Sequence, residues 1–134
     1  MKKNLGKLVT LVALVLVVLA TSATTINAEQ AWVQDSKGWR YGEDGSFITS
    51  NWAVIADKTY YFDASGYMVT GWLQDGVNWY YLESSGEMAT SKWVDGNYYI
   101  KSNGIMATNE WVDGGMYYVD ENGKWVPGKT KQIA

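Results

Sequence analysis

The chain has 134 residues, of which 15% are aromatic, and it contains neither Cys nor His. The lack of both residue types excludes thiol nucleophiles, Ser-His-Asp triads and the usual zinc ligands, so we expect no cofactor, no metal site and no disulfide. Acidic residues (14) outnumber basic ones (11), and the basic residues are scattered along the chain. A surface of this kind argues against nucleic acid as a partner.

Residues 1–28 have the pattern of a secretory signal peptide. A start with three lysines is followed by an apolar run over residues 8–20 and by small residues that end at Ala28. The uninterrupted apolar stretch has ten residues, whereas a helix that spans a bilayer needs about 20. We therefore predict cleavage near Ala28, secretion, and no membrane insertion of the mature chain. An uncleaved anchor is the alternative.

Removal of the leader makes the chain more acidic. Three of the basic residues and none of the acidic ones lie in it, so the mature chain carries a net charge of −6. An acidic chain that is rich in aromatic residues suits a cationic ligand.

Residues 29–128 consist of tandem repeats. Their leading tryptophans are Trp32, Trp52, Trp72, Trp93 and Trp111, at intervals of 20, 20, 21 and 18. Each is followed by a cluster that ends in Tyr, at residues 39–41, 59–61, 79–81, 97–99 and 116–118. A glycine comes next (Gly45, Gly66, Gly86, Gly104 or Gly123), and two residues later Phe47, Met68, Met88, Met106 or Trp125. Five units that agree at four positions indicate a repeat architecture, with residues 129–134 as a short tail.

Each repeat has the pattern of a β-hairpin. In the third repeat, two aromatic runs are separated by Asp75-Gly76, a strong hairpin turn signal. Asp95-Gly96 and Asp113-Gly114 stand at the same place, whereas the second repeat has Ala56-Asp57-Lys58, without a glycine. The later glycine of each repeat fits a second turn with positive φ. Because one hairpin cannot bury enough surface alone, we predict an all-β fold: a β-solenoid of about five stacked hairpins with an aromatic and Met core.

Hairpin register determines which rings share a face. If residues 75–78 form the loop, Trp72 lies opposite Tyr81, and both share a face with Trp79. A three-residue loop over 95–97 gives the fourth repeat the same arrangement, with Trp93 opposite Tyr99, while a two-residue loop would invert the face. We predict the three-residue loop. Four tyrosines then lie on the opposite face as packing residues: Tyr60, Tyr80, Tyr98 and Tyr117.

The segment from Gly71 to Leu82, followed by Gly86-Glu87-Met88, closely resembles the choline-binding, or cell-wall-binding, repeat of Gram-positive surface proteins and lytic enzymes. The resemblance covers roughly residues 32–128. Related repeats also occur in glucan-binding regions of streptococcal glucosyltransferases and in clostridial toxins, so the repeat type does not by itself identify the ligand. The resemblance implies attachment to the bacterial cell surface through choline-decorated teichoic acid or a cell-wall polysaccharide.

The resemblance also implies where choline would bind. In the choline-binding members, it lies between successive hairpins, enclosed by the leading and second Trp of one repeat, the last Tyr of the next cluster and often a Met. One set matches fully: Trp72, Trp79, Met88 and Tyr99. A second set consists of Trp32, Trp39 and Tyr61, with Phe47 at the Met position. Thr59 and Asn97 replace the second Trp in two other repeats, so we expect those interfaces to be weak or empty.

Other functions are compatible with the same repeats. A glucan-binding protein would also use aromatic platforms, and an adhesin could use the repeats as an anchor while another surface binds a host or neighbouring protein. Catalysis by paired carboxylates is disfavoured, because Asp75, Asp95 and Asp113 stand in turns where Asp is favoured for backbone hydrogen bonding. We predict a non-catalytic binding protein.

Overall fold

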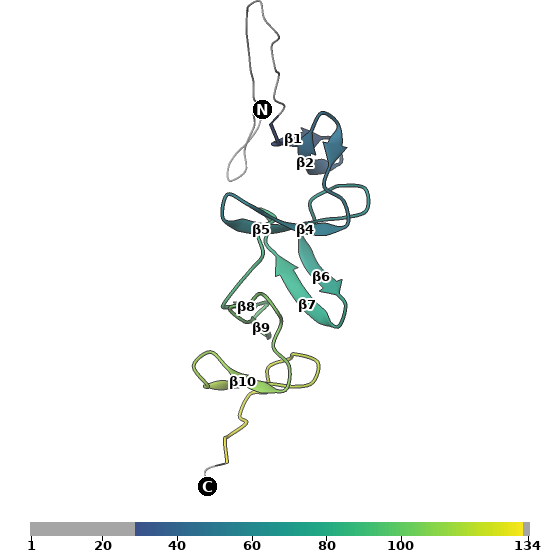
Figure 1. Cartoon of the computed structure of the whole chain (residues 1–134). Coiled ribbons are helices and arrows are strands. Elements are labelled where there is room, and N and C mark those ends of the chain that lie inside the picture. The colour runs from purple at the N-terminus through teal and green to yellow at the C-terminus, as the bar shows by residue number, and fades with distance from the viewer. Residues whose placement is uncertain (1–28, 133–134) are drawn as a thin grey trace, which may run out of the picture. The chain divides into compact units, whose positions relative to one another are not determined.

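The structure is a computed structural model and describes residues 29–132. The predicted signal peptide, residues 1–28, lies outside the described residues. All regular secondary structure in the described part of the chain is β-strand, which confirms the all-β prediction (Figure 1). Between residues 29 and 132 there is no helix long and apolar enough to cross a membrane.

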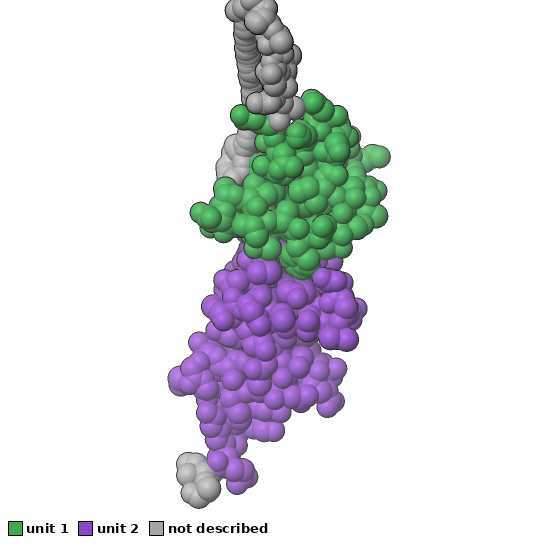
Figure 2. Space-filling view, viewed as in Figure 1, with its two compact units in different colours: residues 1–69 green, residues 70–134 purple. Residues whose placement is uncertain are grey.

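Five antiparallel hairpins fall into two compact units, whose described residues are 29–69 and 70–132 (Figure 2). The first unit contains β1 (Ala31–Asp35) with β2 (Gly38–Glu43) and β3 (Ser46–Phe47), and β4 (Asn51–Ile55) with β5 (Lys58–Phe62). The second contains β6 (Gly71–Asp75) with β7 (Asn78–Leu82), β8 (Lys92–Val94) with β9 (Tyr98–Ile100), and β10 (Glu110–Val112) with β11 (Tyr117–Val119). Each predicted repeat is thus one hairpin. A single solenoid formed by all five hairpins stays a prediction.

The hairpin register agrees with the sequence. Trp72 lies opposite Tyr81 in the β6–β7 hairpin, and this pairing continues to Asp75 opposite Asn78, so the loop is shorter than predicted. In the β8–β9 hairpin Trp93 lies opposite Tyr99. Its loop is the predicted three-residue one over 95–97, closed by the N–H of Asn97, which donates to the carbonyl of Val94 at 3.1 Å.

The second hairpin forms without a glycine in its turn. Ala56 and Asp57 adopt φ angles of 50° and 68°, in the left-handed region that a two-residue hairpin turn requires. Five residue pairs, from Asn51 opposite Phe62 to Ile55 opposite Lys58, hold the two strands in register. Cross-strand pairing therefore offsets the cost of placing Ala in this conformation.

A second turn follows each of the hairpins β4–β5 to β10–β11 and places the next residue of the pattern. Gly66 has a φ of 88°, and its N–H donates to the carbonyl of Asp63 at 2.9 Å, as the predicted turn requires. Two residues later Met68 forms a β-bridge with Phe62. The same bridge joins Met88 to Leu82, Met106 to Ile100 and Trp125 to Val119.

The fully buried side chains differ from those predicted. Four residues that directly follow the Tyr-containing cluster have no exposed surface: Phe62, Leu82, Ile100 and Val119. In the second unit, Val94 and Val112 join two small aliphatic clusters, against which partly buried Trp, Tyr and Met side chains pack. In the second unit the predicted aromatic and Met core is therefore an aliphatic core with aromatic and Met side chains around it, whereas in the first unit the buried hydrophobic residues are the aromatic Tyr60 and Phe62. A Trp side chain is too large to be covered completely by one hairpin, so part of its ring stays accessible.

Candidate functional site

Each leading Trp packs against a Tyr of its own hairpin. The two residues lie opposite each other on paired strands, with ring centroids 5.1 to 5.4 Å apart and T-shaped geometry. The pairs are Trp32–Tyr41, Trp52–Tyr61, Trp72–Tyr81, Trp93–Tyr99 and Trp111–Tyr118. This repeated pairing gives every hairpin one face that carries the leading Trp, which we call its Trp face.

Within each unit, the Trp face of one hairpin meets the opposite face of the next. Because side chains alternate along a strand, the first Tyr of a Tyr-Tyr pair points away from the Trp face of its own hairpin. It is this Tyr that contacts the preceding leading Trp: Tyr60 with Trp32, Tyr98 with Trp72, and Tyr117 with Trp93. Consecutive hairpins of one unit therefore pack with the Trp face of one against the face of the next that carries the first Tyr. The sequence pattern predicted only a packing role for these tyrosines.

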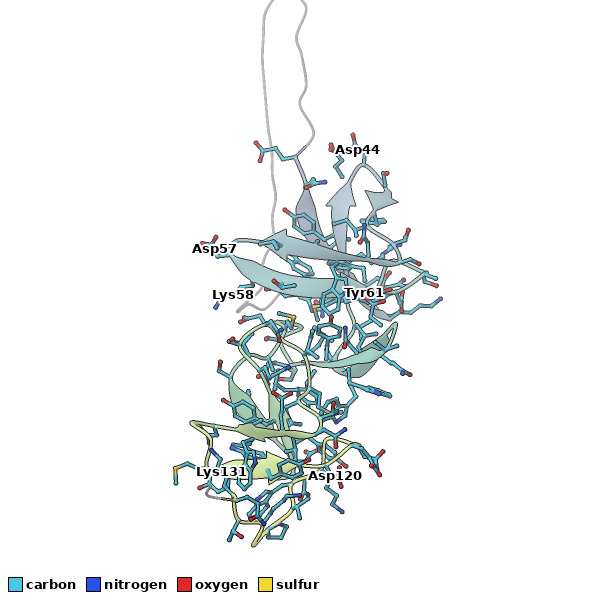
Figure 3. The ribbon with its side chains drawn as sticks, turned by 60° about the horizontal axis from the view of Figure 1, so that its bottom comes forward. Asp44, Asp57, Lys58, Tyr61, Asp120 and Lys131 are labelled. Carbon is cyan, nitrogen blue, oxygen red and sulfur yellow. The ribbon has the colours of Figure 1, made fainter. Side chains whose placement is uncertain are left out.

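In the first unit, the rings of Trp32 and Trp39 lie 6.2 Å apart at 85°. Tyr60 meets Trp32 at 4.9 Å and is itself 4% exposed. Tyr61, which the resemblance assigned to this set and which Figure 3 labels, lies on β5. Its ring packs against that of Trp52, with centroids 5.1 Å apart. The structure therefore brings Trp32 and Trp39 together and adds Tyr60, from the second hairpin, as a neighbour of Trp32.

In the second unit, Trp72 and Trp79 lie 6.3 Å apart at 79°. Tyr98 approaches Trp72 at 5.4 Å and 78°, whereas Tyr99 packs against Trp93. Trp79 is 38% exposed. The indole of Trp79 and the phenol of Tyr98, from consecutive hairpins, thus each stand at a steep angle to the indole of Trp72. A substantial part of the Trp79 surface is open to solvent.

Methionines lie beside these aromatic sets. The N–H of Met106 donates to the carbonyl of Trp79 at 2.8 Å, and Met106 packs on the same aliphatic cluster as Trp72. Met68 makes the equivalent bond to the carbonyl of Trp39 at 2.7 Å. Met88, the predicted member of the second set, lies against Gly104, where a Cβ would come within 2.5 Å of its sulfur. A thioether fills irregular gaps beside rings with little loss of contact.

Phe47 belongs to a charged cluster in the first hairpin. The guanidinium of Arg40 lies 4.2 Å from the centre of the Phe47 ring and 5.1 Å from that of Tyr67, and its Nη2 is 3.2 Å from Asp35 Oδ2. The backbone N–H of Lys37 and the hydroxyl of Tyr67 both donate to the Asp35 carboxylate at 2.8 Å. These bonds lower the pKa of Asp35, and the bond from Tyr67 raises the pKa of that phenol.

The last hairpin already carries cations on its rings. The ammonium group of Lys129 lies 4.0 Å from the centre of the Tyr118 ring. That of Lys131, which Figure 3 labels, lies 5.1 Å from the centre of the Trp111 ring. Both distances are within the range at which a cation is attracted to the negative face of an aromatic ring. The Trp-Tyr pair of a hairpin in this chain is therefore a surface that accepts positive charge.

Comparisons with known proteins agree with this geometry. Residues 48–93 and 92–125 match two family models, each described as a choline-binding repeat. A search of curated proteins gave no match. Among solved structures, the choline-binding domain of CbpL from Streptococcus pneumoniae is 45% identical, with a TM-score of 0.63, and the alignment covers 74% of this chain and 55% of that one.

Two further structures extend the comparison. The choline-binding domain of Spr1274 from the same species is 39% identical, with a TM-score of 0.52 and coverage of 59% of this chain and 95% of that one. The multimodular pneumococcal cell wall endolysin from phage Cp-1, complexed with choline, is 36% identical, with a TM-score of 0.58 and coverage of 80% and 33%. The chain thus spans 55% of the CbpL domain and a third of the endolysin. With matching family models and a relative covered almost completely, the chain belongs to the choline-binding repeat family.

Proposed function

We propose that the protein is a non-catalytic module that holds choline between consecutive hairpins and so attaches to choline-decorated teichoic acid of a cell wall. The observation that carries this proposal is the arrangement of Trp72, Trp79 and Tyr98. The three rings come from two hairpins, and the planes of Trp79 and Tyr98 each stand at a steep angle to the plane of Trp72, so ring faces can line a small group on more than one side.

The chemistry of choline fits such a site. A trimethylammonium group cannot donate a hydrogen bond, but its charge is attracted to ring faces by about 0.5 to 2 kcal/mol per ring, depending on desolvation. The exposed part of Trp79 gives the ligand access. An equivalent site in the first unit consists of Trp32, Trp39 and Tyr60. Because Tyr60 is buried, its ring would lie at the base of this site and have little surface open to solvent.

The choice of tyrosine distinguishes two forms of this proposal. The resemblance assigned Tyr99 and Tyr61, together with Met88 and Phe47, to the two sites. The ring contacts favour Tyr98 and Tyr60 instead, because these face the leading Trp of the preceding hairpin. Met106 and Met68 are then the methionines beside the second Trp of each site.

Charge supports choline over a neutral glucan. The predicted mature chain has a net charge of −6, which attracts cations. The Trp-Tyr pair of the last hairpin, Trp111 and Tyr118, already contacts the ammonium groups of Lys131 and Lys129. A sugar would gain nothing from either feature. The Cp-1 endolysin is described as complexed with choline, and the likeness to it supports the same ligand class here.

Retention on a quaternary-amine resin tests the proposal. The protein should bind the resin and elute with free choline chloride, but not with sodium chloride of equal ionic strength, because a cage recognises the trimethylammonium group itself. Elution by salt alone would reduce the retention to anion exchange by an acidic protein. Binding to dextran without any response to choline would favour the glucan-binding alternative.

A further inference from the structure

The interface between the fourth and fifth hairpins contains a third set of aromatic rings. Trp93 meets Tyr117 at 5.6 Å and 89°, and Trp125 meets both: Trp93 at 6.4 Å and Tyr117 at 6.0 Å. All three pairs have edge-to-face geometry. The set has the same composition as Trp72, Trp79 and Tyr98: two indoles and one phenol.

No complete site is predicted at this interface from the sequence, because Asn97 stands where the second Trp is expected. Backbone hydrogen bonds explain how the ring is replaced. In the second unit, the N–H of Met106 donates to the carbonyl of Trp79, and the N–H of Trp125 donates to the carbonyl of Asn97, both at 2.8 Å. At the interface of the third and fourth hairpins this bond joins a Met N–H to a Trp carbonyl, and at the interface of the fourth and fifth it joins a Trp N–H to an Asn carbonyl. The indole thus belongs to the acceptor residue in the first case and to the donor residue in the second.

Trp125 is held in place by contacts with the β10–β11 hairpin, which it follows in the chain. It bridges to Val119 and packs, together with Trp93 and Tyr99, on the buried cluster of Ala107, Val112 and Val119. Met106 packs in the same way on the cluster of Ala89, Val94 and Ile100. A ring that is fixed on one side by the core needs no reordering to receive a ligand.

The set also has access to solvent and a nearby negative charge. Tyr117 is 37% exposed, close to the 38% of Trp79. The indole N–H of Trp93 donates to Asp113 Oδ2 at 2.9 Å, which ties a carboxylate to the edge of one ring. A carboxylate beside aromatic faces attracts a cation and offers nothing to a neutral apolar group.

From these contacts we infer that Trp93, Tyr117 and Trp125 form a third choline site, in which Trp125 replaces the second Trp of the repeat. This inference rests on the proposed choline-binding function. Trp125 stands at the position that holds Met in three other repeats, and in this inference its ring contacts the ligand.

Indole N–H resonances in a nitrogen-proton correlation spectrum of the purified, labelled protein test the inference. Each of the eight tryptophans has one such signal, so every site reports separately. Choline chloride should shift the signals of Trp93 and Trp125 along one saturating curve. Ethanolamine hydrochloride at equal concentration, a primary ammonium with the same alcohol arm, should shift them far less, because it keeps its water and its hydrogen bonds.

Trp125→Met removes the indole from the proposed site but keeps a residue that occupies the same position in three other repeats. The apparent affinity reported by Trp93 should fall by at least about tenfold, the loss of one cation–π contact of about 1.4 kcal/mol, while that reported by Trp72 changes by less than about twofold. Tyr117→Leu carries the same expectation and serves if Trp125→Met does not fold. Asn122→Ala, an exposed change in the same repeat, is the matched control.

The outcomes separate this inference from the proposed function. If Trp72 and Trp79 respond to choline while Trp93 and Trp125 do not, the third site is wrong and choline binding stands. An unchanged response of Trp93 in both folded variants would also overturn it. If no indole responds in the parent protein, the proposed function fails together with the inference.

Discussion

Tyr98 meets Trp72 edge to face, with ring centroids 5.4 Å apart, although the two residues belong to different hairpins. Its neighbour Tyr99 lies opposite Trp93 in its own hairpin and packs against that ring. Adjacent tyrosines in β9 therefore serve two different interfaces. One belongs to the proposed choline site, and the other completes the Trp face of the fourth hairpin.

Substitution of Tyr98 and substitution of Tyr99 should have different effects on choline binding at Trp72. Tyr98→Leu removes the ring that faces Trp72, so choline affinity reported by the Trp72 indole signal should fall by about tenfold. Tyr99→Leu should leave that affinity within about twofold and instead disturb the Trp93 signal. The opposite result, loss of the Trp72 response in Tyr99→Leu alone, would restore the assignment that the sequence resemblance implied.

Trp79 should matter for binding more than for stability. Its side chain is 38% exposed, whereas Leu82, three residues later in the same strand, is fully buried. Trp79→Leu should lower the free energy of unfolding without ligand by about 1 kcal/mol or less, and Leu82→Ala, as the control, by about 2 to 5 kcal/mol. Denaturant unfolding measures both values. Equal losses would mean that Trp79 is a core residue.

Gly104 is required for two separable reasons. Its φ of 88° disfavours any side chain, and a Cβ would come within 2.5 Å of Met88 Sδ. Gly114 has a similar φ of 72° but open space around it. Gly114→Ala should therefore cost only the conformational term, about 1 kcal/mol, and Gly104→Ala about 1 to 3 kcal/mol more.

The comparison of these two glycine variants depends on packing alone. Thermal or denaturant unfolding of both proteins gives the difference directly. If the two substitutions destabilise the protein equally, Met88 can move away from Gly104 without cost, and the contact between the two repeats is looser than the structure indicates.

Stability should depend on the ionisation of Asp35 at low pH. The N–H of Lys37, together with the Tyr67 hydroxyl, holds the pKa of Asp35 below its ordinary value. A group whose pKa is lower in the folded state stabilises that state above its unfolded pKa of about 3.9 and loses the contribution as pH falls through the folded value. Tyr67 has its pKa raised by the same bond, so its contribution is present below about pH 10 and is lost at higher pH.

Asp35→Asn should remove the acidic part of this dependence. The denaturant midpoints of parent and variant should differ at about pH 6 and converge as the pH falls below about 4. A constant difference across that range would show that the Asp35 carboxylate contributes through geometry and not through its charge. The site is exposed, so added salt should weaken the effect.

The sequence predicted much of the local structure. Alternation along the strands and the turn glycines gave the register that places Trp72 opposite Tyr81 and Trp93 opposite Tyr99, because side-chain direction follows directly from position in a strand. Even the loop over residues 95–97 followed from the need to keep Trp93 on the same face. These features depend on residues close together in the chain.

Contacts between hairpins could not be predicted in the same way. Alternation assigns Tyr98 and Tyr99 to opposite faces, but which face meets the preceding hairpin depends on the path of the chain through the second turn, around Gly86. Likewise, the Trp at position 125 followed the Met pattern in the sequence. Only its backbone bond to Asn97 places the ring beside Trp93.

The central claim, that aromatic cages bind choline in the folded protein, is tested most directly by the melting temperature in choline chloride against equal sodium chloride. A ligand that binds only the folded state at 100 times its Kd stabilises by about 2.7 kcal/mol per site, and for a domain of this size that raises Tm by about 10 °C or more. With cages of three rings we expect Kd on the order of millimolar, so about 100 mM choline is sufficient. We predict a rise of this size in choline and little change in sodium chloride or ethanolamine hydrochloride. Equal melting temperatures in choline and in sodium chloride would contradict the claim.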